Sequence, residues 1–217
     1  MMIDQLINAT RKAITGWRAS RLGPGTTLLV LMMACISHLP AQTQPIWGEG
    51  LDGTKVTELA PSGTHVLVLF FVASDCPISN RTFPEMQRLR EKYELKGVTF
   101  WYVYPNDGET MTTIAEHQAS YDRNGHALLT HSPEIVRLGH ALATPEVAVL
   151  HRSGSSPWLN DYAGRIDNRY VKFGLERPKA TEHFADDAIT AVLAGRKPAP
   201  ATGNIVGCSI MSPGARR

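Results

Sequence analysis

The stretch HVLVLFFVASDCPISN, residues 65–80, decides the fold of this 217-residue chain. Residues 65–73 form a nearly unbroken apolar run rich in β-branched and aromatic side chains, which is typical of a central strand covered on both faces. Pro77, Ser79 and Asn80 then favour the start of a helix. The stretch therefore predicts a buried strand that leads into a helix, with Cys76 at the junction.

The residues that follow continue an alternation of helices and strands. Phe83, Met86, Leu89 and Tyr93 recur at helical spacing until Gly97 ends the run. The later segments predict a strand over 98–104, a helix over 110–121, a short strand over 126–130, a helix over 133–141, a hairpin of strands over 146–151 and 162–166, and an amphipathic helix over 181–193. This order predicts an α/β fold with a central mixed β-sheet flanked by helices.

The composition favours one compact domain and excludes several classes of protein. With 43% hydrophobic residues, the chain can bury one sizeable core. The 22 Lys and Arg nearly balance the 20 Asp and Glu, and no basic run occurs, so we expect no nucleic acid partner. Three cysteines are too few for a disulfide scaffold. The histidines do not cluster at metal-ligand spacing, and the domain lacks a glycine-rich dinucleotide loop, so we expect neither a metal site nor an organic cofactor.

The first forty-one residues have the character of a targeting segment. An uncharged apolar run over 26–36 follows four basic residues and is too short to span a bilayer comfortably. This pattern predicts that residues 1–41 are a signal peptide, cleaved near Ala41, or a membrane or lipid anchor, with Cys35 as the cysteine that would carry a lipid. We therefore expect an exported domain over 44–195, periplasmic or tethered to the membrane through its N-terminus and facing away from the cytoplasm.

The last residues, 196–217, are rich in Pro, Ala and Gly and predict an irregular, flexible tail. This tail carries Cys208. The apolar neighbours Ile205, Val206 and Ile210 indicate that the segment around Cys208 docks on the domain.

Cys76 is the strongest candidate for a reactive side chain. At a strand exit its sulfur would face free N–H groups and the positive end of a helix dipole, which favour the thiolate. A thiol with a lowered pKa and partial exposure is a nucleophile. The charge of Asp75 opposes the thiolate, and Arg81 is a candidate to offset it. The alternative is a buried cysteine with a purely structural role.

Residues 50–193 resemble the thioredoxin-fold redoxin family, related to alkyl hydroperoxide reductase and thiol-specific antioxidant proteins. Three elements carry the resemblance: Cys76-Pro77-x-Ser79 between strand and helix, Ala143-Thr144-Pro145-Glu146 ahead of a strand, and Gly164-Arg165-Ile166-Asp167 in the hairpin. The resemblance implies a thioredoxin-like fold in which a cis-proline, Pro145, packs with Thr144 beside Cys76. It also implies thiol oxidoreductase chemistry on disulfides or peroxides.

The sequence also departs from the family's motifs. Ser79 stands where thioredoxins have the second cysteine of Cys-x-x-Cys, so a vicinal disulfide cannot form. Leu69 and Ala73 replace the proline and the threonine that precede the reactive cysteine of peroxiredoxins. Asn80 replaces the second cysteine of the copper-delivery proteins of this fold.

Cys208 is the candidate resolving thiol, because a sulfenic acid or mixed disulfide at Cys76 needs a second thiol. The alternative is a spare thiol. Ser79, Arg81 and Arg165 are candidate neighbours of the active site, whereas the scattered histidines, His117 among them, predict solvated or capping roles.

The sequence thus predicts an exported thioredoxin-like thiol oxidoreductase. Cys76 attacks a protein disulfide or a small peroxide, Thr144 and Pro145 shape the groove, and Cys208 or an external thiol reductant regenerates Cys76. Two alternatives stay open: a metal-handling module that holds a soft ion such as Cu(I) through Cys76, Cys208 and a histidine, and a redox-silent module that binds partners.

Overall fold

The computed structural model describes residues 45–210. The expected signal or anchor segment, with Cys35, lies outside this range, as do residues 211–217. No helix within residues 45–210 has both the length and the apolar character needed to cross a membrane.

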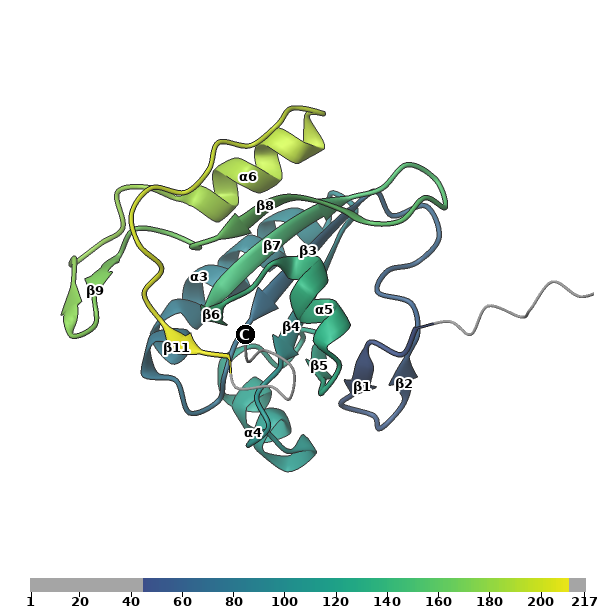
Figure 1. Ribbon diagram of the computed structural model, residues 1–217, viewed down its shortest axis with the longest axis horizontal. Coiled ribbons are helices and arrows are strands. Elements are labelled where there is room, and N and C mark those ends of the chain that lie inside the picture. Colours follow the sequence, from purple (N-terminus) through teal and green to yellow (C-terminus); the bar gives the residue numbers. More distant parts are fainter. Residues whose placement is uncertain (1–44, 211–217) are drawn as a thin grey trace, which may run out of the picture. The chain divides into compact units, whose positions relative to one another are not determined.

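A mixed sheet of seven strands forms the centre of the described chain (Figure 1). Its order is β2 (Lys55–Val56), β1 (Gly48–Gly50), β5 (Ala127–Leu129), β4 (Val98–Tyr104), β3 (Val66–Phe71), β7 (Glu146–His151) and β8 (Leu159–Gly164). β3 runs parallel to β4 and antiparallel to β7, and β4 runs parallel to β5. β7 and β8 form the predicted antiparallel hairpin.

Four helices of the described chain pack on the two faces of this sheet: α3 (Pro77–Glu94), α4 (Met111–Tyr121), α5 (Pro133–Gly139) and α6 (Phe184–Leu193). α3 and α6 share one core with Val68 and Phe70 of β3. α5 joins a second core with Leu67 and Leu69, whose side chains leave β3 on its other face. Every residue of β3 is buried, so the prediction of a strand covered on both faces is confirmed.

Two small two-stranded sheets complete the architecture. β9 (Tyr170–Lys172) and β10 (Leu175–Glu176) form a hairpin, and β6 (Ala143–Thr144) pairs with β11 (Cys208–Ser209). Figure 1 shows the chain leaving α6 and running back to place β11 beside β6. Most of the described tail is irregular, as expected, but β11 was not predicted.

The predicted helices and strands are confirmed with small shifts at their ends. β3 ends at Phe71, and the helix that starts at Pro133 ends at Gly139 because His140 adopts a left-handed conformation with φ 54°. The last helix starts at Phe184, three residues later than expected. The short strands β1, β2, β6, β9, β10 and β11 were not predicted.

Candidate active site

Cys76 is the N-cap residue of α3, with extended backbone angles of φ −85° and ψ 111°. Its carbonyl accepts the first hydrogen bond of the helix, from the Asn80 N–H at 3.0 Å. Across the strand-to-helix junction, the Ser79 hydroxyl oxygen accepts a hydrogen bond from the Ala73 N–H at 3.4 Å. The predicted position at a helix start is confirmed, and the side chain is only 1% exposed.

The loop before β7 packs against this sulfur. The Thr144–Pro145 peptide bond is cis, as the resemblance implied. In its thiol form Cys76 donates a hydrogen bond to the carbonyl oxygen of Thr144, 3.4 Å away. Residues far apart in the sequence, Cys76 and Thr144, are thus in direct contact.

Cys208 reaches the same place from the C-terminal segment. In the β6–β11 pair, Cys208 lies opposite Thr144 and Ser209 lies opposite Ala143. The Thr144 hydroxyl donates to the Cys208 carbonyl at 3.4 Å. The Cys208 side chain packs on the cluster that contains Cys76, and both cysteines are free thiols. The structure therefore brings the predicted resolving residue to the predicted nucleophile.

The two thiols have opposite tendencies to ionise. Burial acts to raise the pKa of Cys76, but hydrogen bonds from Cys208, Ser79 and Ile78 outweigh it and leave the pKa below that of an ordinary thiol. Burial, together with the hydrogen bond to Cys76 and the negative charges of Cys76 and Asp75, raises the pKa of Cys208 to about 12. Of the pair, Cys76 therefore ionises more readily, and Cys208 holds its proton more firmly.

A polar network fixes the loop that precedes Cys76. The carboxylate of Glu109, only 6% exposed, accepts hydrogen bonds from the backbone N–H and the hydroxyl of Ser74, both at 2.7 Å. The Asn80 amide donates to the Ser74 carbonyl at 3.1 Å. Sequence reasoning missed Glu109, because its distance from Cys76 along the chain gives no signal.

His117 extends this network into the core. Because the amide nitrogen of Asn80 donates to Ser74, its oxygen must accept, so His117 Nε2 carries a proton and donates to it at 2.7 Å. His117 Nδ1 then accepts from the Tyr104 hydroxyl at 2.7 Å. The expectation of a solvated or capping histidine was wrong for His117, which α4 buries to 8% exposure. Burial lowers its pKa to about 4.

This buried neutral histidine predicts a loss of stability in acid. In the unfolded chain His117 titrates near its ordinary pKa of about 6.5, well above its folded value of about 4. Between these values the unfolded state binds more protons, so the free energy of unfolding falls as the pH falls, by about 3 kcal/mol at pH 4 from this residue.

Urea unfolding of the chain between pH 7 and pH 4 measures this effect. The wild type should lose more stability on acidification than His117→Gln, whereas His131→Gln, which alters an exposed side chain, should follow the wild type. An identical loss in His117→Gln and in the wild type would contradict the assignment.

A second buried carboxylate holds the cis-proline loop. Glu146 is 2% exposed and accepts hydrogen bonds from the backbone N–H groups of Leu142 at 2.6 Å and Ala143 at 2.7 Å. Burial raises the pKa of this carboxyl above its usual value. Its place directly after Pro145 was visible in the sequence, but its inward orientation was not.

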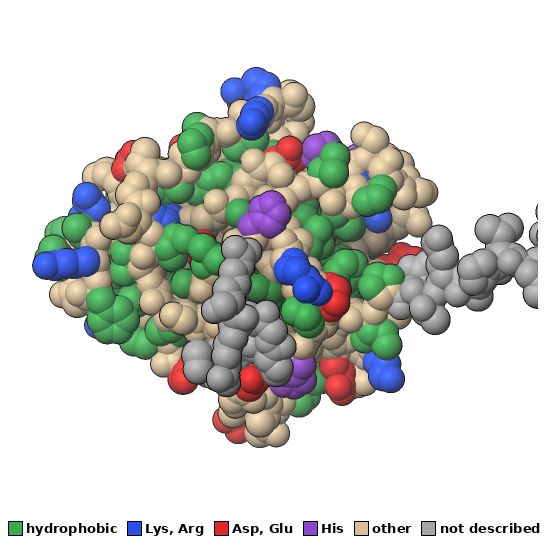
Figure 2. Space-filling view, viewed as in Figure 1, with side chains coloured by type: hydrophobic (Ala, Val, Ile, Leu, Met, Phe, Trp, Pro, Cys, Tyr) green, Lys and Arg blue, Asp and Glu red, His purple; other side chains and the backbone are tan. Residues whose placement is uncertain are grey.

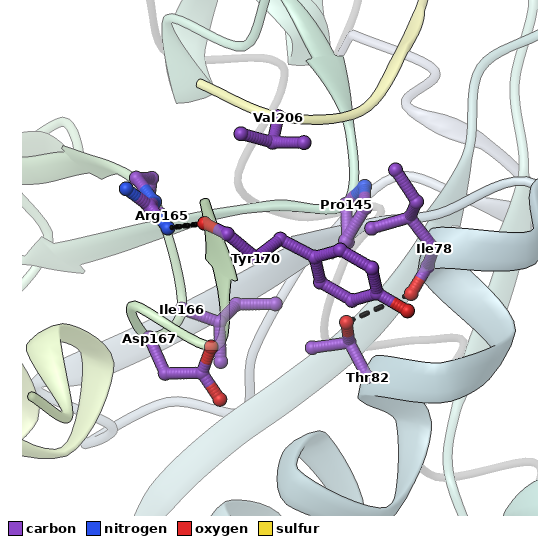
Figure 3. A pocket seen from close by; sticks show the side chains of 8 residues that line it. All are labelled: Ile78, Thr82, Pro145, Arg165, Ile166, Asp167, Tyr170 and Val206. Atoms are coloured by element: carbon purple, nitrogen blue, oxygen red, sulfur yellow. Dashed lines mark hydrogen bonds between the residues drawn. The ribbon is translucent and has the colours of Figure 1, made fainter. Parts of the chain in front are cut away.

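A small pocket adjoins the cluster that contains Cys76, with which it shares Ile78 and Val206 (Figure 3). It is lined by Ile78, Thr82, Pro145, Arg165, Ile166, Asp167, Tyr170 and Val206. Arg165, one of the predicted neighbours, donates hydrogen bonds to the carbonyls of Tyr170 and Thr202, and burial lowers the pKa of its guanidinium. Val206 of the C-terminal segment also packs on the cluster formed by Ala73, Cys76 and Ile78.

The other predicted neighbours of Cys76 have different surroundings. Ser79 is buried, and hydrogen bonding by it helps to lower the pKa of Cys76. Arg81 forms an ion pair with Glu176 of β10 at 2.8 Å and is largely exposed, so the structure does not bring it to Cys76 or Asp75. Within residues 45–210, no three His, Cys, Asp or Glu side chains are grouped so that they could hold a metal ion.

Comparisons with known proteins agree with this architecture. No protein-family model and no curated protein matches the chain. An uncharacterized conserved protein from Geobacillus kaustophilus is similar in structure, with 21% identity over 82% of this chain and 95% of that chain and a TM-score of 0.61. A hypothetical protein from Sinorhizobium meliloti 1021 has 18% identity over 79% and 92% of the two chains and a TM-score of 0.60.

A weaker likeness, with a TM-score of 0.44, is to a secreted disulfide oxidoreductase from Mycobacterium tuberculosis, at 17% identity over 70% of this chain and 96% of that chain. The chain itself places a cysteine between the central strand β3 and helix α3, and a cis-proline ahead of the antiparallel strand β7. The chain therefore has the thioredoxin-like fold.

Proposed function

We propose that this chain is a thiol-disulfide oxidoreductase with Cys76 as the nucleophile and Cys208 as the resolving thiol. The observation that carries the proposal is the packing of Cys208, which lies opposite Thr144, on the cluster that contains Cys76 at the N-terminus of α3, beside the cis-proline. The pKa of Cys76 lies below its ordinary value, and that of Cys208 lies above it. This difference supports a role for Cys76 as the attacking thiolate and for Cys208 as the thiol that reacts in the second step.

The first step is the reaction of Cys76 with a substrate disulfide. The thiolate attacks one sulfur, the substrate S–S bond breaks, and the other substrate sulfur leaves as a thiolate that takes a proton from solvent. The product is a mixed disulfide between Cys76 and the substrate. Because Cys76 is then neutral, the charge that raised the pKa of Cys208 is gone, and Cys208 gives up its proton more readily.

The second step releases the substrate as a dithiol. The Cys208 thiolate attacks Sγ of Cys76, the mixed disulfide breaks, and the second substrate sulfur leaves as a thiolate and is protonated. The substrate disulfide has gained two electrons and two protons, and the chain now holds a disulfide between Cys76 and Cys208. An external thiol or dithiol reductant returns the chain to its starting state.

The residues around the pair support this chemistry. Thr144 and Pro145 form the wall against which the sulfur lies, and Ser79 donates a hydrogen bond to the thiolate without offering a second thiol. Glu109 and Glu146 hold the two loops that meet at Cys76. We assign the roles of Thr144, Pro145 and Ser79 to positioning and stabilisation of the thiolate.

Disulfides are favoured over peroxides as substrates. Leu69 and Ala73 stand at the positions of the proline and threonine that precede the reactive cysteine of peroxiredoxins. Membership of the peroxiredoxin-related branch and an antioxidant role stay predictions. They would be favoured if hydrogen peroxide oxidised Cys76 of the Cys208→Ser variant to a sulfenic acid faster than a peptide disulfide reacted with it.

Alkylation rates test the assignment of the two thiols. At pH 7 iodoacetamide should modify Cys76 of the wild-type chain more than about tenfold faster than Cys208, because only the thiolate reacts. Mass spectrometry of the two cysteine peptides measures each rate while both thiols are present. Burial slows both reactions, so the ratio of the two rates should also be measured in urea, where it should approach one.

Equal rates in the folded chain, without reaction with any disulfide, would favour the redox-silent module. Stoichiometric Cu(I) binding that Cys208→Ser abolishes would favour the metal-handling alternative.

We also propose that the chain works outside the cytoplasm, with residues 1–41 as its signal or anchor, 44–195 as its redoxin domain and 196–217 as its tail. The apolar run over 26–36 after four basic residues supports this division. Expression of the full chain in a bacterium, followed by fractionation and N-terminal sequencing, tests it. A mature chain that begins near residue 42 supports cleavage, and a full-length cytoplasmic chain contradicts export.

A further inference from the structure

The C-terminal segment Val206-Gly207-Cys208 lies in the groove beside Cys76 in an arrangement that a substrate would need. Cys208 is in register with Thr144 of the cis-proline loop, and its side chain packs on the cluster that contains Cys76. Val206, two residues earlier, lines the pocket with Ile78 and Pro145 (Figure 3). Val206 and Cys208 both pack on the cluster formed by Ala73, Cys76 and Ile78, on either side of a bend at Gly207. The segment therefore contacts the wall of the pocket and the surroundings of the sulfur together.

Gly207 shows how closely this segment approaches the loop. A Cβ atom at this position would lie 2.4 Å from the carbonyl oxygen of Thr144 and 2.9 Å from its carbonyl carbon. Both are backbone atoms, which cannot rotate away as a side chain can. The groove therefore admits a glycine, and excludes larger residues, immediately before the cysteine.

Few interactions hold the segment in place. β11 pairs with β6 over only two residue pairs, and two further hydrogen bonds join the segment to the loop: Ile210 N–H to the Leu142 carbonyl at 3.3 Å and the Thr144 hydroxyl to the Cys208 carbonyl at 3.4 Å. The Ile210 side chain, after the cysteine, is buried in the second core. Val206 and Cys208 are only partly buried. A second extended segment that makes the same contacts can therefore compete for the groove.

The surroundings of the groove fit a protein rather than a small molecule. Leu142 of the cis-proline loop is 69% exposed, and Phe173 at the tip of the β9–β10 hairpin is 67% exposed. Val171 and Leu175 of the same hairpin are also exposed, and Tyr170 at its base lines the pocket. Figure 2 shows hydrophobic side chains at the left edge of the molecule, where this hairpin projects in Figure 1. Apolar surface of this kind is covered when a protein partner binds.

We propose that Val206-Gly207-Cys208 is a tethered mimic of the substrate, and that the site selects extended protein segments with the order aliphatic residue, glycine, cysteine. This inference rests on the proposed function and adds the substrate class. The tail also competes with the substrate, so it lowers the rate of the first exchange step until it is displaced. After displacement, the tail returns with Cys208 for the resolving step.

Peptide selectivity tests the proposal in the full-length Cys208→Ser variant, which can form but not resolve a mixed disulfide. The probes are peptides of the sequence GNIVGCSI, each activated as a mixed disulfide with a coloured aromatic thiol. The peptide with Asp in place of Val, and the peptide with Leu in place of Gly, should each react with Cys76 at least about tenfold more slowly. Equal rates for the three peptides would overturn the selectivity.

Substitutions in the tail test the competition. In the Cys208→Ser chain, Gly207→Leu should raise the rate with the GNIVGCSI probe several-fold, because the tail no longer fits beside Thr144. Gly108→Ala is the matched control, since an added Cβ there meets nothing within 4 Å. An unchanged rate in Gly207→Leu would overturn the competition.

A small disulfide separates the failure of this inference from the failure of the proposed function. If Cys76 exchanges with oxidised glutathione but does not distinguish the peptides, the substrate class is wrong and the oxidoreductase function stands. If Cys76 exchanges neither with oxidised glutathione nor with any peptide, both are wrong.

Discussion

Replacing Cys76 with serine is expected to reduce the rate of disulfide reduction by at least about a thousandfold. A serine hydroxyl in this position stays protonated at neutral pH and does not attack a disulfide, although it can keep the hydrogen bond to the Thr144 carbonyl. The measurement is steady-state reduction of a peptide disulfide with a dithiol as the electron donor. Because the side chain is nearly isosteric, circular dichroism should show an unchanged fold.

Cys208→Ser provides the matched variant at the same site. It should still carry out the first exchange but accumulate the mixed disulfide with substrate, which mass spectrometry detects as an adduct on Cys76. Turnover by Cys76→Ser close to that of the wild type would contradict the assigned nucleophile. Turnover by Cys208→Ser at the wild-type rate, without an adduct, would instead remove the resolving role from Cys208.

Asp122→Ala is expected to cause a large loss of stability, about 3 to 5 kcal/mol in the free energy of unfolding. The Asp122 side chain is 1% exposed and accepts hydrogen bonds from the Arg90 guanidinium at 2.7 and 2.8 Å and from the Tyr102 hydroxyl at 2.7 Å. Its removal leaves the charge of Arg90, itself buried, facing Tyr102 without its main partner. Urea denaturation followed by circular dichroism measures the loss.

An exposed ion pair supplies the control for this prediction. Glu134 and Arg137 lie on the surface of α5 with more than half of each side chain exposed, and their nitrogen and oxygen are 2.9 Å apart. Removal of the pair by Arg137→Ala should change stability by no more than about 1 kcal/mol. Equal losses in the free energy of unfolding for Asp122→Ala and Arg137→Ala would contradict the prediction that the buried ion pair contributes more to stability than the exposed one.

The central fold was predictable because local sequence and tertiary position agree in its main elements. The apolar run over 65–73 has one stable solution, a strand buried on both faces, and β3 adopts it. The spacing of Phe83, Met86, Leu89 and Tyr93 likewise places one face of α3 on the sheet. The short strands were not predictable, since two or three residues carry no period and form only where a partner strand is present.

The candidate site was predictable only in part. A strand-to-helix junction gave the position of Cys76, and the resemblance gave the cis bond at Pro145. The apolar neighbours of Cys208 predicted that its segment docks on the domain, but not where. Its register opposite Thr144 depends on tertiary contacts of Gly207 that no local pattern records. Glu109 and His117 were missed because hydrogen bonding across three elements determines their roles.

Identification of the oxidised product tests the central claim most directly. One equivalent of a peptide disulfide is added to the reduced full-length chain, free thiols are blocked at low pH, and the digest is analysed by mass spectrometry without reduction. We predict a single peptide pair joined by a disulfide between Cys76 and Cys208, with release of two substrate thiols per chain. Recovery of Cys76 and Cys208 as separately alkylated peptides, with the substrate disulfide intact, would contradict the account.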